Sequence, residues 1–264
     1  MQPQMLADAA VKAPWLTVHP VSQQDSVAAN SPASIFAGPV RRIIDSSTRP
    51  QMSKLRFSVT MSLDGYVAGP NQSLKDPLGV GGEALHGWAV ELAAFQEVHG
   101  KKGGVVNASS TIMQEMFKNV GAVIMGRGMF GGGPGPWPPD WKGWWGENPP
   151  YHMPVFVLTH HARDPLPMRG GTTFHFVTEG IESALSEARQ AAAGKDVLIG
   201  GGASAIQQFL AAGLVDEVNV SVVPLFLGGG ERLFANLGDP APRFEQTRVI
   251  EAPGVVHVRY RVAR

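Results

Sequence analysis

The stretch DVLIGGGASAIQQFL, residues 196–210, passes from an apolar run through three glycines directly into an amphipathic pattern. The apolar run predicts a buried strand, and Ile206, Phe209 and Leu210 fall at helical spacing after the glycines. A helix N-terminus carries unpaired backbone N–H groups and a partial positive charge, and glycines let a phosphate approach them closely. The junction is therefore either a phosphate-binding cradle or a tight turn that needs glycine for its backbone angles.

The segments around this junction alternate between strand and helix patterns, which is typical of an α/β protein. Strands are expected at residues 55–62, 122–126, 154–160, 173–178, 196–200, 215–224 and 255–263. Helices are expected at residues 84–98, 110–120 and 181–194, and from the glycine junction to Gly213. The last strand alternates apolar and polar residues, which favours an antiparallel edge region. We expect a three-layer α/β/α fold with a mixed, mostly parallel sheet and helices on both faces.

Composition divides the chain into two parts. Residues 1–51 are rich in Ser, Pro, Ala and Gln without a sustained hydrophobic period, so we expect a disordered extension there. The periodic pattern begins at Met52, which makes residues 52–264 the expected folded domain. A chain of 264 residues that is 44% hydrophobic and 17% charged can bury one sizeable core.

Charge and composition exclude several classes of function. The 22 Lys and Arg balance 22 Asp and Glu, so the chain has no broad positive field to bind nucleic acid. The absence of cysteine excludes disulfides, thiolate metal sites and the zinc-deaminase signature. No run approaches the ~20 apolar residues of a membrane span and no signal-peptide pattern is present, so we expect a cytoplasmic protein that does not bind membranes.

Three histidines invite comparison with a metal site. His160 and His161 are adjacent, so in a strand they would point to opposite faces. No carboxylate is clearly spaced with them or with His152. We therefore expect no metal.

Two further strand ends carry groups suited to anions. In AVIMGRGMF, residues 122–130, a strand ends in Gly126 and Arg127 where a helix would begin, and the guanidinium adds a charged fork to the backbone donors. Alternatively, Arg127 is a solvated surface charge. The segment VLTHHARD, residues 157–164, ends a strand in groups suited to a phosphomonoester: Thr159, His160, His161 and Arg163.

In this order, the motifs SLDGYVAG, VIMGRGMF, VFVLTHH, VLIGGGASAIQQFL and DEVNVSVVPLFLGGGERLF resemble the dihydrofolate-reductase-like superfamily. The nearest resemblance is to stand-alone relatives of the reductase domain of riboflavin-biosynthesis deaminase-reductases, over nearly all of residues 52–264. It implies a fold that binds NADPH across the carboxyl ends of the strands. The implied activity is hydride transfer to a small, planar heterocyclic or carbonyl substrate. Related reductase domains are often dimers, so we expect a homodimer.

The resemblance also assigns cofactor contacts residue by residue. They would be Thr60 and Val67 at the nicotinamide, Gly126 and Arg127 at the phosphates, Thr159 and His160 at the adenosine 2′-phosphate, and Gly200, Gly201, Gly202, Ala203 and Ser204 at the pyrophosphate. No acidic residue follows the glycines at the spacing that ribose recognition in a Rossmann unit requires. We therefore expect NADPH to be preferred over NADH.

Asp64 is the candidate catalytic residue, because SLDG follows the first strand near the expected nicotinamide. It would orient the substrate or relay a proton, or else it is an Asp-Gly turn residue that bonds its own backbone. The first-helix carboxylate of classical dihydrofolate reductases has no counterpart, since Ala93 stands in its place. A nucleotide- or flavin-binding module without turnover is therefore the alternative function.

The loop PGPWPPDWKGWWGENPPYHMP, residues 134–154, carries four tryptophans among prolines and glycines. It could form a wall that stacks on a planar heterocycle. It could also be a hydrophobic cluster that holds a long loop in place, or a contact between subunits. The last of these would suit an oligomer that binds no cofactor.

Overall fold

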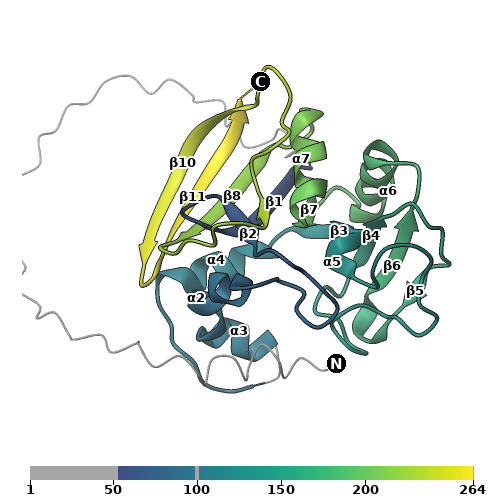
Figure 1. Ribbon diagram of the computed structural model, residues 1–264, viewed down its shortest axis with the longest axis horizontal. Coiled ribbons are helices and arrows are strands. Elements are labelled where there is room, and N and C mark those ends of the chain that lie inside the picture. Colours follow the sequence, from purple (N-terminus) through teal and green to yellow (C-terminus); the bar gives the residue numbers. More distant parts are fainter. Residues whose placement is uncertain (1–52, 99–100, 264) are drawn as a thin grey trace, which may run out of the picture.

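A computed structural model describes residues 53–98 and 101–263 of the chain. The expected extension at 1–51 lies outside the described residues. Figure 1 shows a long sheet with helices against both faces. No helix in the described part of the chain is long and apolar enough to cross a bilayer.

Strands and helices are interspersed along the described part of the chain. The strands are β1 (Leu55–Ser62), β2 (Tyr66–Ala68), β3 (Val120–Gly126), β4 (Pro154–Leu158), β5 (Leu166–Pro167), β6 (Thr173–Val177), β7 (Asp196–Gly201), β8 (Glu217–Val223), β9 (Glu231–Arg232), β10 (Arg243–Ala252) and β11 (Val255–Ala263). The helices are α2 (Gly87–Val90), α3 (Ala93–Val98), α4 (Ala108–Met116), α5 (Arg127–Phe130), α6 (Ile181–Ala192) and α7 (Ala203–Ala211), and the short 3-10 helices are η3 (Gly82–His86) and η4 (Arg169–Gly171).

Among these residues, nine strands form one sheet in the order β10-β11-β8-β1-β7-β3-β4-β6-β5. The six strands from β8 to β6 in that order run parallel. β10, β11 and β5 add antiparallel pairs at the two ends. The mixed, mostly parallel sheet and the antiparallel edge region at the C-terminal strand are therefore confirmed.

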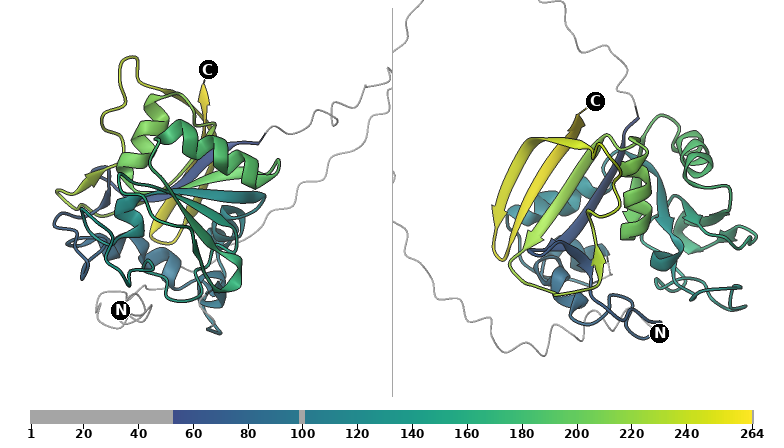
Figure 2. Two further views of the ribbon diagram at one scale, coloured as in Figure 1. Left: turned by 90° about the vertical axis from the view of Figure 1, so that its right-hand side faces the viewer. Right: turned by 45° about the horizontal axis from the view of Figure 1, so that its top comes forward.

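The two faces of the sheet carry different helices. Ile124 of β3 belongs to the same core cluster as Ile206 of α7, whereas the next residue, Met125, packs with Phe130 of α5. Neighbouring residues of a strand point to opposite faces, so α7 and α5 cover opposite faces. The green helices α6 and α7 lie on the same face in Figure 2, and α2 contacts Thr60 on the other. This arrangement is the expected three-layer α/β/α fold.

The prediction of a single helix at residues 84–98 is wrong. The segment instead forms η3, α2 and α3, with a break at Glu91 and Leu92. The break arises because these residues pair with a passing segment: Ala93 N–H donates to Val105 O at 2.9 Å, and Val105 N–H donates to Glu91 O at 2.8 Å. Tertiary pairing thus overrides a helical pattern that is continuous in the sequence.

A second departure is β10, which was not expected. This strand forms the outer edge of the sheet, paired only with β11 on one side. Most of its residues are exposed, so it lacks the apolar run or the alternation by which strands are recognised. The helix expected at 110–120 also ends earlier, at Met116.

Gly103 and Gly104 allow the pairing that breaks the helix to be tested. Both have positive φ, but a Cβ on Gly104 would lie 2.7 Å from the Ala93 nitrogen, whereas a Cβ on Gly103 would meet nothing within 4 Å. We expect Gly103→Ala to lower the free energy of unfolding by about 1 kcal/mol through its backbone angle alone. Gly104→Ala should lower it by about 2 kcal/mol more, because the segment must move away from α3. Urea denaturation measures both, and equal losses would contradict the close contact.

Candidate functional site

The carboxyl ends of the parallel strands meet at one edge of the sheet, and β7 lies in their midst between β1 and β3. The chain leaves β7 through α7 toward β8 on one side, and leaves β3 through α5 toward β4 on the other. In open α/β sheets, ligands bind in the crevice where successive connections diverge in this way. The glycine junction after β7 and the Gly126–Arg127 turn after β3 both lie at this crevice.

The glycines of the junction have different reasons to be glycine. Gly201 has φ +128°, a backbone conformation that other residues rarely adopt, and its peptide bond to Gly202 is cis. Gly202 is the N-cap of the nine-residue α7 with ordinary angles, φ −78° and ψ −170°. A Cβ on Gly202 would meet no atom within 4 Å. The turn therefore explains Gly201, while open space in front of a helix N-terminus remains at Gly202.

The residues expected at the phosphates come together across three strand ends. A Cβ on Gly126 would lie 3.7 Å from the Gly202 nitrogen, so the two glycine turns adjoin. Arg127 Nη1 donates to Thr159 Oγ1 at 3.4 Å, which joins the ends of β3 and β4. Arg127 Nε donates to Gly133 O at 3.2 Å. The alternative reading of Arg127 as a solvated surface charge is therefore wrong.

Arg127 and Arg163 form a cationic corner around the indole of Trp137. The guanidinium carbon of Arg127 lies 3.5 Å from the centre of a Trp137 ring, and that of Arg163 lies 5.4 Å from it. Arg127 Nη2 and Arg163 Nη1 are buried atoms without a hydrogen-bond partner in the described residues. Burial, and then the charge of Arg163, lower the pKa of Arg127. Two neighbouring cations without a carboxylate partner among residues 53–98 and 101–263 favour a bound anion.

The other expected cofactor contacts occupy separate places. Thr60 is buried on β1, where its Oγ1 accepts a hydrogen bond from Trp88 Nε1 at 3.3 Å. Val67 on β2 packs against the main core cluster. His160 is exposed on the loop after β4. Ala203 is buried and Ser204 exposed in the first turn of α7, whereas Gly200 follows the buried part of β7.

The Asp64 carboxylate joins the loop after β1 to the loop after β8. It accepts hydrogen bonds from Ser62 Oγ at 2.6 Å, from Leu227 N–H at 3.2 Å and from Gly228 N–H at 2.7 Å. The hydrogen bond from Ser62, followed by those from the backbone, lowers the pKa of Asp64. This residue therefore does more than close its own turn: it holds together the two loops that border the carboxyl edge.

The aromatic loop is a hydrophobic cluster in the described structure. Trp137, Trp141 and Trp145 pack against a core cluster that contains Phe130 and Phe174. Trp141 Nε1 donates to Phe130 O at 3.1 Å, which fixes the loop to the end of α5. This confirms the interpretation of the loop as a hydrophobic cluster that holds itself in place. The same loop supplies Trp137, the ring against which Arg127 packs.

The sequence matches the family of the RibD C-terminal domain over residues 53–258. The chain belongs to this family. Membership of the RibD C-terminal domain family supports a reductase-type function and confirms the resemblance drawn from the motifs. Curated proteins give no sequence match.

Among solved structures, one with a TM-score above 0.5 shows the same fold at low sequence identity, and two others are less similar. A riboflavin biosynthesis protein from Shewanella sp. PV-4 is similar over 80% of this chain and 99% of its own, with 21% identity and a TM-score of 0.53. The diaminohydroxyphosphoribosylaminopyrimidine deaminase/5-amino-6-(5-phosphoribosylamino)uracil reductase from Thermotoga maritima has 14% identity over 81% of this chain and 57% of its own, with a TM-score of 0.47. Dihydrofolate reductase from Enterococcus faecalis, solved with NADP(H), has 14% identity over 80% of this chain and 97% of its own, with a TM-score of 0.44.

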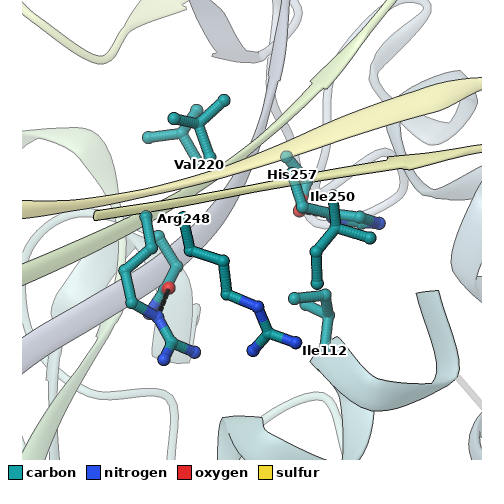
Figure 3. Close-up of a pocket in the computed structure, with 9 residues that line it drawn as sticks. Ile112, Val220, Arg248, Ile250 and His257 are labelled. Atoms are coloured by element: carbon teal, nitrogen blue, oxygen red, sulfur yellow. Dashed lines mark hydrogen bonds between the residues drawn. The ribbon is translucent and has the colours of Figure 1, made fainter. Parts of the chain in front are cut away.

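Two small hollows lie elsewhere, between α4 and the strands β8 and β11. Figure 3 shows the first of them, where Arg248 points toward Ile112 of α4. Glu115 accepts hydrogen bonds from both Arg248 and Arg259, at 3.0 Å and 2.6 Å, so these cations are already paired. The cationic corner at Arg127 differs in this respect. No group of three metal-binding side chains occurs in the part of the chain that the structure describes.

Asp64→Asn tests the link between the two loops. The amide offers one acceptor oxygen in place of two, so the Gly228 N–H should lose its partner and exchange faster with solvent. Hydrogen exchange of the backbone amides measures this effect. Asp140→Asn, at an exposed carboxylate in the aromatic loop, is the matched control and should leave the Gly228 rate unchanged.

The same link predicts a pH dependence. The folded pKa of Asp64 is lowered below the ~3.9 of an unfolded chain, so the ionised carboxylate contributes stability above that value. This contribution is lost as the pH falls through the folded pKa. The stability difference between the protein and its Asp64→Asn variant should therefore be full near neutral pH and shrink below about pH 4. A difference that does not change with pH would contradict this prediction.

Proposed function

We propose that the protein is an NADPH-dependent reductase that transfers hydride to a small, planar heterocyclic or carbonyl substrate. The observation that carries the proposal is a pair of buried guanidinium nitrogens, on Arg127 and Arg163, that have no hydrogen-bond partner among the described residues. Arg127 directly follows Gly126, whose turn adjoins the glycine junction. A dinucleotide that carries an additional phosphomonoester suits this arrangement. Its pyrophosphate matches the glycine junction, and its phosphomonoester matches the cationic corner.

The residues present fit such a cofactor on two counts. At Gly202, the space that a Cβ would fill is open and faces the N-terminus of α7, where backbone N–H groups favour an anion. At the cationic corner, Thr159 offers a hydroxyl beside Arg127, and burial lowers the pKa of Arg163. Neither arginine forms an ion pair with a carboxylate in the described part of the chain. A bound phosphomonoester would supply the missing counter-charge.

In the proposed reaction, bound NADPH supplies the hydride, and the chain supplies binding and orientation. Gly202 and the first turn of α7 would hold the pyrophosphate. Arg127, Arg163 and Thr159 would hold the 2′-phosphate and so favour NADPH over NADH. Thr60 on β1 would face the nicotinamide, and Asp64, which links the loops after β1 and β8, would keep in place the loops that border the substrate.

A nucleotide- or flavin-binding module without turnover is the second candidate. It is favoured by Asp64, because both carboxylate oxygens already accept hydrogen bonds within the protein. It is also favoured by Ala93 at the start of α3, because alanine stands where dihydrofolate reductases carry a carboxylate. The two candidates differ in one measurement. The reductase oxidises NADPH when a heterocyclic or carbonyl acceptor is added, whereas the binding module binds a nucleotide and leaves the acceptor unchanged.

Gly202→Val tests the pyrophosphate position. Gly202 has ordinary backbone angles, and a Cβ there would meet no atom within 4 Å, so stability should fall by less than about 1 kcal/mol. The branched side chain would occupy the space in front of α7, and the NADPH dissociation constant measured by calorimetry should rise at least about tenfold. Gly87→Ala, exposed and also without a neighbour within 4 Å, is the control. Gly201 is unsuitable for this test, because its positive φ would strain any variant.

Arg127→Ala and Arg163→Ala test the cationic corner. Each removes one charged donor to the 2′-phosphate, so each should raise the NADPH dissociation constant about tenfold, equivalent to about 1.4 kcal/mol. The dissociation constant for NADH, which lacks this phosphate, should change much less. Arg189→Ala, at an exposed position on α6, controls for the loss of a positive charge. Equal affinity of the unaltered protein for both cofactors would refute the assignment.

A further inference from the structure

The indole of Trp137 contacts both arginines of the cationic corner. The guanidinium carbon of Arg127 lies 3.5 Å from the centre of one of its rings, and that of Arg163 lies 5.4 Å away. Arg127 directly follows β3, and Arg163 lies in the loop after β4, the neighbouring strand. One half-buried side chain from a third segment, the aromatic loop, thus touches the cations of two adjacent strand ends.

The ring of Trp137 is itself fixed from several sides. Its Nε1 donates to His161 O at 2.7 Å. The rings of Phe130 and Phe176 meet it edge-on, at 5.6 Å and 4.9 Å between centroids. A hydrogen-bonded N–H together with edge-to-face aromatic contacts restricts an indole to one orientation. Arg127 therefore packs against a surface whose position the surrounding structure determines.

The same contacts form a closed circuit of four residues. His161 N–H donates to Thr159 Oγ1 at 3.1 Å, and Thr159 Oγ1 also accepts from Arg127 Nη1 at 3.4 Å. The circuit therefore runs from Arg127 through Trp137, His161 and Thr159 back to Arg127. Removing the indole would open it at two places, the stack on the guanidinium and the hydrogen bond to His161.

The contacts that orient Arg127 are with neutral groups. Its Nε donates to Gly133 O, its Nη1 donates to Thr159 Oγ1, and its guanidinium lies over the indole. A carboxylate partner would compensate the charge of the arginine and occupy its N–H groups. An aromatic face attracts a cation through the ring quadrupole and leaves both the charge and the N–H groups available. The indole thus orients the guanidinium without neutralising it.

Orientation matters for these two cations because both are long side chains and both carry the same charge. A mobile arginine loses rotamer entropy when it binds an anion, so an arginine that is already ordered binds more tightly. Like charges also repel, and contact with an aromatic face offsets part of that repulsion. Both effects act on the group that the arginines bind, and not on a pyrophosphate at the glycine junction.

We propose that Trp137 is a positioning residue that determines cofactor specificity. Its indole holds Arg127 and Arg163 ready for the 2′-phosphate and so sets the preference for NADPH over NADH. Trp137 acts through the two guanidinium groups, and the cofactor need not touch its ring. This inference rests on the proposed function, which places a phosphomonoester at the cationic corner, and it assigns the discrimination to a residue of the aromatic loop.

Trp137→Leu in the full chain tests the proposal. Calorimetric titration should show that the NADPH dissociation constant rises about tenfold, because the arginines lose their aromatic support. The NADH dissociation constant should change by less than about twofold, since NADH lacks the 2′-phosphate. An NADPH preference that is unchanged in this variant would overturn the inference and leave the cofactor proposal standing. Equal affinity of the unaltered protein for both cofactors would overturn both.

Trp141→Leu is the matched control. Trp141 lies in the same loop, packs against the same core cluster, and its Nε1 also donates to a backbone carbonyl, Phe130 O, at 3.1 Å. Its loss should lower the melting temperature about as much as the loss of Trp137 and leave the ratio of the two dissociation constants unchanged. A fall of that ratio in both variants would show that Trp137 merely holds the loop, and would overturn its role in specificity.

Two further variants separate the ring face from the rest of the side chain. Trp137→Phe keeps an aromatic face but cannot donate to His161 O, so the NADPH preference should stay within about threefold of that of the unaltered protein. Trp137→Met fills more of the space than leucine without an aromatic face and should lose the preference as Trp137→Leu does. The comparison therefore does not depend on the folding of one variant. Equal losses in the phenylalanine and methionine variants would overturn the role of the ring face.

Discussion

The insertion of β7 between β1 and β3 is the constraint on which the rest of the structure depends. β7 comes late in the chain, yet Val197 to Ile199 pair with Leu55 to Phe57 on one side and with β3 on the other. Right-handed crossovers to opposite sides must then leave on opposite faces, so α7 and α5 diverge and the edge between them stays uncovered. The two glycine turns adjoin there because strand pairing holds them, and not because they are close in sequence.

The two faces of β1 differ in polarity. Leu55 and Phe57 belong to the main core cluster, whereas Ser58 and Thr60 point to the layer of α2 and α4. The apolar face supplies the hydrophobic contribution to folding. The polar face leaves room for hydrogen-bonded rows that a wholly apolar sheet would exclude.

Much of the architecture was predictable because its signals are local. The apolar runs of β1, β3, β4, β6 and β7, and the glycine junction before α7, follow from the periodicity of neighbouring residues. The break between α2 and α3 could not be predicted in this way, because Val105 imposes it from beyond the segment. β10 could not be predicted either, because an exposed edge strand has little apolar pattern in its sequence.

The residues of the candidate site also divide into those that local sequence predicts and those that only the folded chain brings together. The glycines and Arg127 are identifiable from the sequence because they stand where strands end and helices begin. The part played by Arg163 depends on its approach to Trp137, which only the folded loop defines. The neighbourhood of Thr60 depends on register across three strands, because Thr60 pairs with Ser221 and Ser221 pairs with His257. Local patterns therefore revealed the elements of the site but not its lateral contacts.

The contact between Trp137 and Arg127 joins two parts of the chain that can change in sequence to different degrees. Arg127 belongs to the sheet edge, which strand pairing constrains, whereas Trp137 belongs to a surface loop of the kind that tolerates substitution and changes in length. Because the indole packs against the guanidinium, substitutions in that loop can shift the position of Arg127 while every residue of the sheet edge stays the same. Two descendants of this chain could thus differ in the placement of this charge without a single change in the motifs by which they would be recognised as relatives.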